Sequence, residues 1–117
     1  MVQEPVIEYS FGRLEFDGAS YGEDVLILPD GTVRPWRRDH KHHLKFSYLE
    51  EIVAAAPRVL VIGTGQRGVM EVPDKVLVKL AEQGIDAEPM PTEKAIKRFL
   101  HLLKDGKSVA AALHLTC

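Results

Sequence analysis

The feature that most constrains this chain is an apolar strand that runs directly into a glycine-rich segment. Residues 59–62 read Val-Leu-Val-Ile, and four consecutive branched apolar residues are typical of a strand buried on both faces. Gly63, Gly65 and Gly68 follow at once with the spacing G-x-G-x-x-G. A buried strand that ends in such a turn indicates an α/β domain.

The same glycines mark a dinucleotide site only when a helix begins beside them, because its N-terminus holds the pyrophosphate. Pro73 cannot lie inside a helix, so the next helix is expected to begin near this residue, several positions after the glycines. Asp86 lies close to the spacing of a ribose-binding acid, but the chain is too short for a full set of βαβ units. We therefore expect no NAD or FAD site and no other cofactor.

A looser anion site at this turn is an alternative, in which main-chain amides and the Arg67 side chain bind the ligand. The protein would then be a small-molecule or anion-binding enzyme centred on the turn. The candidate residues are Gly63, Thr64, Gly65, Gln66, Arg67 and Gly68. The plainer interpretation is that the glycines only permit a tight exit from the strand with positive φ.

The rest of the chain predicts β structure first and alternating helices and strands afterwards. Short apolar runs and turn residues predict an antiparallel meander across residues 6–36. Ser47 and Glu50 form a capping box at the start of one predicted helix, and Thr92 is the expected cap of another. The predicted helices are 47–56, 73–83 and 92–105, and the later strands are 59–62, 85–88 and 109–115. This order predicts an α/β fold with a mixed sheet and helices on at least one face.

Composition excludes several classes of protein. A length of 117 residues corresponds to one domain, residues 1–117. The net charge of −2 supplies no basic field for nucleic acid, and no apolar run approaches the ~18 residues of a membrane span. Cys117 is the only cysteine, so no disulfide forms within one chain. We expect a cytoplasmic protein that binds neither nucleic acid nor membrane.

The segment after residue 35 combines an indole with basic side chains. Trp36, Arg37 and Arg38 form a candidate partner surface, because tryptophan and arginine dominate interaction hot spots. The alternative is that Trp36 covers the core at the end of a strand. His40, His42 and His43 resemble metal ligands, but no cysteine–histidine pattern supports them, and we expect no metal site.

The end of the chain contains a histidine and a cysteine, two residue types that can form a catalytic nucleophile and its base. His114 and Cys117 are three residues apart, so in a strand they point to opposite faces. The sequence identifies no separate carboxylate that would orient the histidine. We therefore expect no catalytic residue here.

Several segments together resemble one known family across nearly the whole chain. They are residues 59–65, Gly84-Ile85, residues 91–95, residues 109–117 and the Trp36–Arg38 loop with its following histidine. The pattern is similar to that of the small domain family that contains the adipogenesis-associated domain protein and a mitochondrial complex I assembly factor. Leu100 departs from it, since the family commonly has asparagine there.

The resemblance implies a single compact three-layer α/β domain, here with an N-terminal β meander, a mixed sheet and three helices. It implies no reaction, and the mitochondrial relatives suggest assembly through protein contacts. Our leading hypothesis is a non-catalytic interaction or assembly module with an unknown protein partner, and a homo-oligomer is possible. The contact surface would combine the Trp36–Arg38 loop with the Gly63–Gly68 turn.

Overall fold

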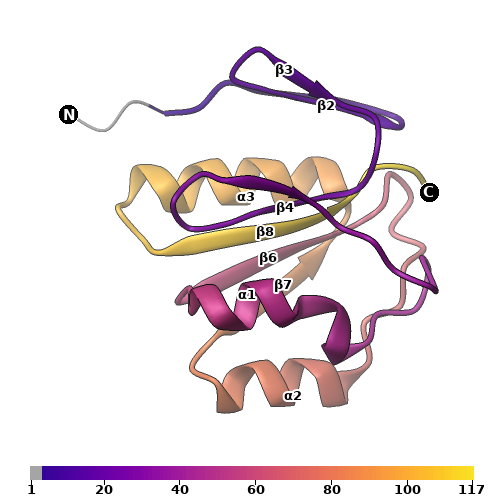
Figure 1. The fold of residues 1–117 in the computed structure, drawn as a ribbon, viewed down its shortest axis with the longest axis vertical. Helices are drawn as coiled ribbons and strands as arrows, with labels where there is room; N and C mark the ends of the chain where they lie inside the picture. The colour runs from indigo at the N-terminus through magenta and orange to yellow at the C-terminus, as the bar shows by residue number, and fades with distance from the viewer. Residues whose placement is uncertain (1–3) are drawn as a thin grey trace.

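The computed structural model describes residues 4–117 as two β-sheets and three α-helices (Figure 1). The smaller sheet is antiparallel, with the order β1-β2-β3. Its strands are β1 (Ile7–Ser10), β2 (Arg13–Phe16) and β3 (Ala19–Tyr21). The meander predicted for residues 6–36 is therefore correct only as far as Tyr21, because the next two strands join the larger sheet.

The larger sheet has five strands in the order β5-β4-β8-β6-β7. These are β4 (Val25–Ile27), β5 (Val33–Pro35), β6 (Val59–Thr64), β7 (Asp86–Met90) and β8 (Val109–His114). Strand β6 runs parallel to β7 and β8, whereas β4 is antiparallel to β5 and β8. The predicted α/β fold with a mixed sheet and three helices is confirmed.

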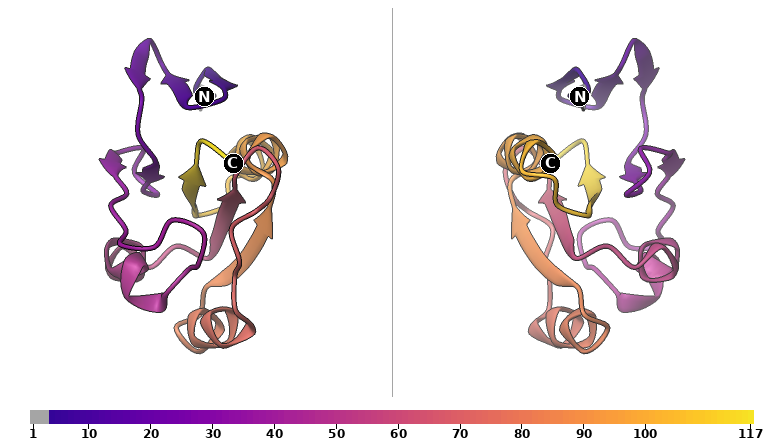
Figure 2. Two further views of the ribbon diagram at one scale, coloured as in Figure 1. Left: turned by 90° about the vertical axis from the view of Figure 1, so that its right-hand side faces the viewer. Right: turned by 90° about the vertical axis from the view of Figure 1, so that its left-hand side faces the viewer.

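Helices cover both faces of the large sheet, which gives three layers (Figure 2). One face packs against a 3₁₀ helix η1 (Phe46–Leu49), α1 (Glu50–Ala55) and α2 (Asp74–Glu82). The other face packs against α3 (Thr92–Lys104) and the small sheet. The side chains of β6 alternate between the two cores, with Leu60 and Ile62 on the first face and Val61 on the second. This alternation explains why residues 59–62 are apolar at every position.

Two predicted helix caps are wrong. Ser47 lies inside η1, and α1 begins at Glu50 after Leu49 with no side-chain cap. Thr92 is the first residue of α3 rather than its cap, which is Pro91. In the second case the hydroxyl that would cap the helix is used in a tertiary contact, described below.

The predicted strand 85–88 is shifted along the chain, because β7 begins at Asp86 and runs through Pro89 to Met90. Proline lacks the N–H that a central strand needs, and β7 tolerates it because β7 lies at the edge of the sheet. Residues 109–114 form a strand, as predicted, and its three alanines are completely buried. Their small side chains let layers on both faces approach the sheet closely.

Candidate functional site

The carboxyl ends of the parallel strands β6, β7 and β8 meet at one edge of the large sheet. Three segments gather there: residues 36–43 after β5, residues 65–71 after β6, and residues 115–117 after β8. They lie together on the right-hand side of Figure 1. We call this place the strand-end edge. Ligands of open α/β sheets usually bind at such an edge.

The first two of these segments are joined by main-chain hydrogen bonds. The Leu44 N–H donates to the Glu71 carbonyl at 2.9 Å, and the Glu71 N–H donates to the His42 carbonyl at 2.8 Å. His43 and Glu71 form a short parallel bridge. The end of the segment after β5 is therefore held beside the end of the segment after β6.

The glycine-rich turn packs against its own chain. The Gln66 N–H donates to the Thr116 carbonyl at 2.7 Å, and the Val69 N–H donates to the Cys117 carbonyl at 3.3 Å. Gly65 has a φ of +108°, and a side chain there would collide with the main chain of Cys117. Few amides of the turn remain for a ligand. Helix α2 begins only at Asp74, as Pro73 predicted. The geometry therefore supports neither a dinucleotide nor an anion site at residues 63–68.

The Thr92 side chain holds the glycine-rich turn against the neighbouring elements by two hydrogen bonds. Its Oγ1 accepts a hydrogen bond from the Gly65 N–H at 2.9 Å and donates one to the His114 carbonyl at 2.5 Å. Gly63 leaves room for this threonine, because an added Cβ would lie 2.9 Å from its Oγ1. One completely buried hydroxyl thus connects β6, α3 and β8.

A buried polar network lies beside the turn. Asp24 Oδ2 lies 2.7 Å from His114 Nδ1 and 2.9 Å from Arg38 Nη2, and Asp24 Oδ1 accepts from the Leu115 N–H at 2.8 Å. The side chains of Arg38 and His114 are each 1% exposed, and that of Asp24 is 11% exposed. Three segments distant in sequence therefore meet at one carboxylate.

Burial raises the pKa of Asp24, but the hydrogen bonds from His114 and Leu115, with the nearby charges, outweigh it and hold the pKa at about 2. Burial lowers the pKa of Arg38, and the Asp24 carboxylate opposes this shift. Asp24 is thus ionised at neutral pH. A carboxylate only accepts hydrogen bonds, so His114 must carry a proton on Nδ1.

Trp36 belongs to the core. Its side chain is 4% exposed, and its Nε1–H donates to the Tyr48 carbonyl at 3.0 Å. The Arg38 guanidinium stacks on the indole, with Cζ 4.0 Å from the ring centroid. This corrects the prediction that Trp36, Arg37 and Arg38 together face a partner, because only Arg37 is exposed. The alternative, that Trp36 covers the core, agrees with the structure.

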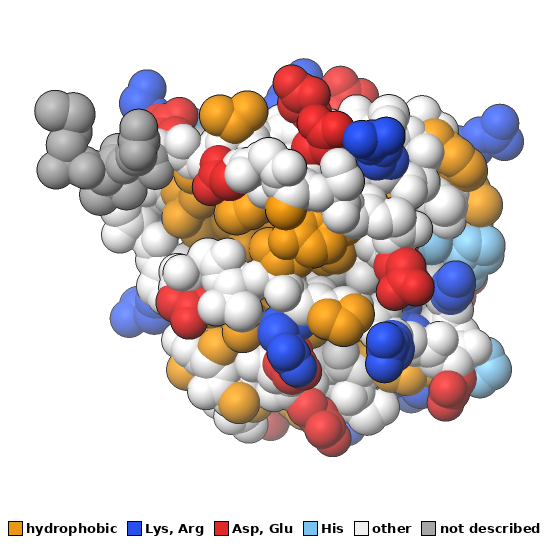
Figure 3. Space-filling view, turned by 45° about the horizontal axis from the view of Figure 1, so that its top comes forward, with side chains coloured by type: hydrophobic (Ala, Val, Ile, Leu, Met, Phe, Trp, Pro, Cys, Tyr) orange, Lys and Arg blue, Asp and Glu red, His pale blue; other side chains and the backbone are white. Residues whose placement is uncertain are grey.

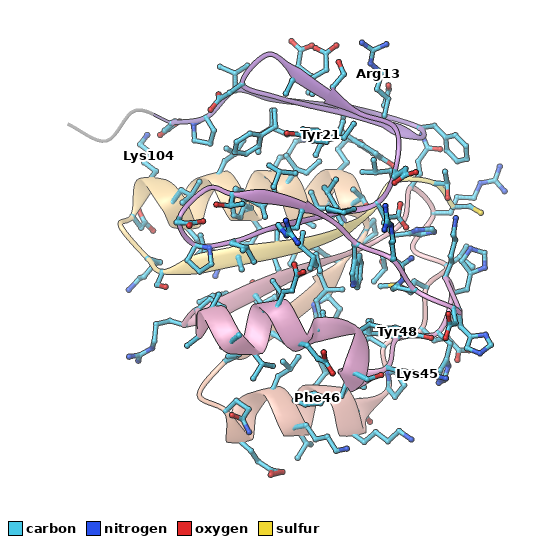
Figure 4. All side chains as sticks on the ribbon, in the orientation of Figure 1. Arg13, Tyr21, Lys45, Phe46, Tyr48 and Lys104 are labelled. Carbon is cyan, nitrogen blue, oxygen red and sulfur yellow. The ribbon has the colours of Figure 1, made fainter. Side chains whose placement is uncertain are left out.

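The three clustered histidines have separate contacts. His43 Nδ1 lies 3.4 Å from Glu71 Oε2, and the His40 N–H donates to the hydroxyl of Tyr48, which Figure 4 labels, at 3.2 Å. His42 Nε2 is 3.8 Å from Cys117 Sγ, and its ring lies edge-on to that of His114. Across residues 4–117, His, Cys, Asp and Glu side chains form no group of three that could hold a metal ion. Within the same range, each helix is too short or too polar to cross a membrane.

A pocket of about 260 Å³ opens beside the buried network. Its charged lining residues are Glu23, Asp24, Arg37, Arg38 and Lys41. The Nε and Nη1 atoms of Arg38 are buried and have no hydrogen-bond partner among the described residues.

A second, more apolar pocket of about 420 Å³ lies where α3 ends, away from the strand-end edge. Phe16, Leu28, Phe99 and Leu103 contribute its apolar lining. Figure 3 shows hydrophobic side chains gathered in a hollow of the face that carries the small sheet.

Sequence reasoning did not find the Asp24–Arg38–His114 network. The available signals were a carboxylate directly before the apolar run 25–28 and a histidine inside the apolar run 109–115. Both are atypical of buried strands, since such groups are buried only when paired. The sequence gives no indication that these two residues, so distant along the chain, would pair with each other.

Comparison with known proteins agrees with this architecture. A family profile described as a protein of unknown function (DUF498/DUF598) matches residues 6–114. The chain belongs to this family. Solved structures of other proteins share the fold over nearly the whole chain, and a curated protein matches it in sequence.

A conserved hypothetical protein, PH1505 of Pyrococcus horikoshii OT3, is 28% identical, with a TM-score of 0.78 over 96% of this chain and 99% of its own. A protein described as an outer membrane protein from Bartonella henselae is 23% identical, with a TM-score of 0.84 over 98% and 97% of the two chains. The 13 kDa major membrane protein of Francisella tularensis subsp. holarctica (strain LVS) is 24% identical over 96% of this chain and 93% of its own.

Proposed function

We propose that this protein is a non-catalytic interaction module that binds a protein partner through its strand-end edge. The observation that carries the proposal is the main-chain pairing of His42 and Leu44 with Glu71, which holds the segment 37–43 beside the segment 65–71. The polar groups that suggest chemistry, Asp24 and His114, lie beneath this surface and bond to each other.

The exposed part of this surface defines the kind of partner. On the two segments, three arginine or lysine side chains and two acidic ones are exposed, on a chain with a net charge of −2. Arg37, Lys41 and Arg67 are exposed, and Val69 adds an exposed apolar group. A partner patch with acidic side chains around an apolar centre would complement this surface.

The resemblance to a complex I assembly factor supports the same proposal, since assembly factors act through protein contacts. We extend only that general role to this chain and propose that residues 1–117 act as one domain. A cytoplasmic location is also part of the proposal. The membrane-protein descriptions of two relatives make cell fractionation its direct check.

Affinity capture from the native organism, followed by binding assays with each purified candidate partner, tests the interaction. The double variant Arg37→Glu, Arg67→Glu reverses charge on the strand-end edge. The matched control Arg58→Glu, Lys107→Glu changes exposed residues at the other ends of β6 and β8. We expect the edge variant to weaken partner binding about tenfold or more and the control to bind like the wild type. Equal binding by both variants contradicts the proposal.

A further inference from the structure

The guanidinium of Arg38 is only partly used by the protein. Its Nη2 atom donates to Asp24 at 2.9 Å and to the Lys41 carbonyl at 3.1 Å. Its Nε and Nη1 atoms are buried and have no hydrogen-bond partner among residues 4–117. The side chain as a whole is 1% exposed. A buried N–H of a charged group that lacks an acceptor is costly, so these two nitrogens indicate a hydrogen-bond partner from outside the chain.

The same arginine lines the pocket of about 260 Å³ beside the buried network. Three cationic and two acidic side chains face this pocket, a formal excess of one positive charge. The volume is below the range of about 300–1,000 Å³ that holds drug-sized ligands. Size and charge together favour a small anion with one negative charge over a nucleotide or a doubly charged phosphate.

We infer that this pocket binds a carboxylate group, which accepts a charge-assisted hydrogen bond from the unused nitrogens of Arg38. Arg37 and Lys41 are exposed and also line the pocket, and their positive charges attract the ligand. The carboxylate belongs either to a free organic acid or to an acidic side chain of a partner. The inference itself does not depend on the proposed interaction, since the pocket lies within one chain.

Titration of the purified protein by NMR tests the inference. Acetate and lactate serve as free acids, blocked N-acetyl-aspartate amide represents a partner's side chain, and sodium chloride controls for ionic strength. We expect saturable shifts of the Arg38 Nε–H and of the Leu115 and Thr116 amides, with a Kd on the order of 1 mM. Binding of the free acids alone identifies a metabolite site, and equal binding of the blocked aspartate identifies a site for a protein carboxylate.

Three exposed positions give variants that leave the buried network intact. Lys41→Gln removes a positive charge from the pocket and should weaken binding about threefold to tenfold, whereas Glu23→Gln removes a repulsive charge and should tighten it by a similar factor. Lys107→Gln, outside the pocket, should change nothing. The inference is overturned if the shifts do not saturate or if sodium chloride reproduces them. It is also overturned if neither Lys41→Gln nor Glu23→Gln changes the Kd.

Discussion

His114 Nδ1 lies 2.7 Å from Asp24 Oδ2, which ties the last residue of β8 to the residue that precedes β4. Arg38 reaches the same carboxylate oxygen at 2.9 Å from the segment after β5. The Asp24 carboxylate therefore holds three separate segments of the chain together at the strand-end edge. The stability of that edge should depend on this carboxylate.

Asp24→Asn should destabilise the protein strongly, because it leaves the buried Arg38 guanidinium without its counter-ion. Breaking a buried ion pair on one side costs about 3–5 kcal/mol, and we expect the lower end because asparagine keeps an acceptor oxygen. The free energy of unfolding in urea measures the effect. Asp86→Asn, an exposed position on β7, should stay within about 0.5 kcal/mol of the wild type. Similar midpoints for both variants would show that the network does not stabilise the fold.

Asp24 should also make stability depend on pH in the acid range. Its pKa in the folded protein is about 2, below the ordinary value of 3.8. The stabilisation is therefore fully present above 3.8 and is lost as the pH falls through about 2. The shift corresponds to about 2 kcal/mol. The wild type should lose about that much more stability than Asp24→Asn across this window, and parallel profiles of the two proteins would refute the assignment.

Gly65→Ala should destabilise the strand-end edge. The residue has a φ of +108°, and a methyl group there would collide with the Cys117 main chain. We expect a loss of at least about 2 kcal/mol in thermal or urea unfolding. Gly22→Ala is the matched control, since its Cβ would meet nothing within 4 Å. If the two variants have the same free energy of unfolding, the close approach of Gly65 to the Cys117 main chain does not constrain the fold.

Trp36→Ala should act on stability, because the indole is buried and its N–H is bonded to Tyr48. The loss of a large core side chain costs about 3–5 kcal/mol. Arg37→Ala, the exposed neighbour, should change the free energy of unfolding by less than about 0.5 kcal/mol. A stable Trp36→Ala protein that no longer binds a partner would instead make the indole a surface anchor.

The sequence was most informative where local rules and burial agree. The apolar run 59–62, the glycines after it and Pro73 correctly predicted a central strand, a tight exit and a late helix. The run 109–115, which no helix cap precedes, correctly predicts a strand, and β8 covers residues 109–114. These features depend on neighbouring residues and are visible without knowledge of tertiary contacts.

The missed features all depend on contacts between distant segments. The hydroxyl of Thr92 looks like a helix cap, but it bonds to Gly65 and His114 instead. Trp36 and Arg38 look like a surface pair because the segment is polar, yet both side chains are buried and stack on each other. A local pattern cannot reveal which distant group will take a hydrogen bond.

Site-specific photo-cross-linking in the native organism tests the central claim, that the strand-end edge is where a partner binds. Val69 and Val78 are both exposed valines, the first on the edge and the second on α2. Each is replaced in turn by a benzophenone-bearing amino acid, and covalent adducts are identified by mass spectrometry. We expect a discrete protein adduct from position 69 and none from position 78. An adduct from position 78 alone, or none from position 69, contradicts the account.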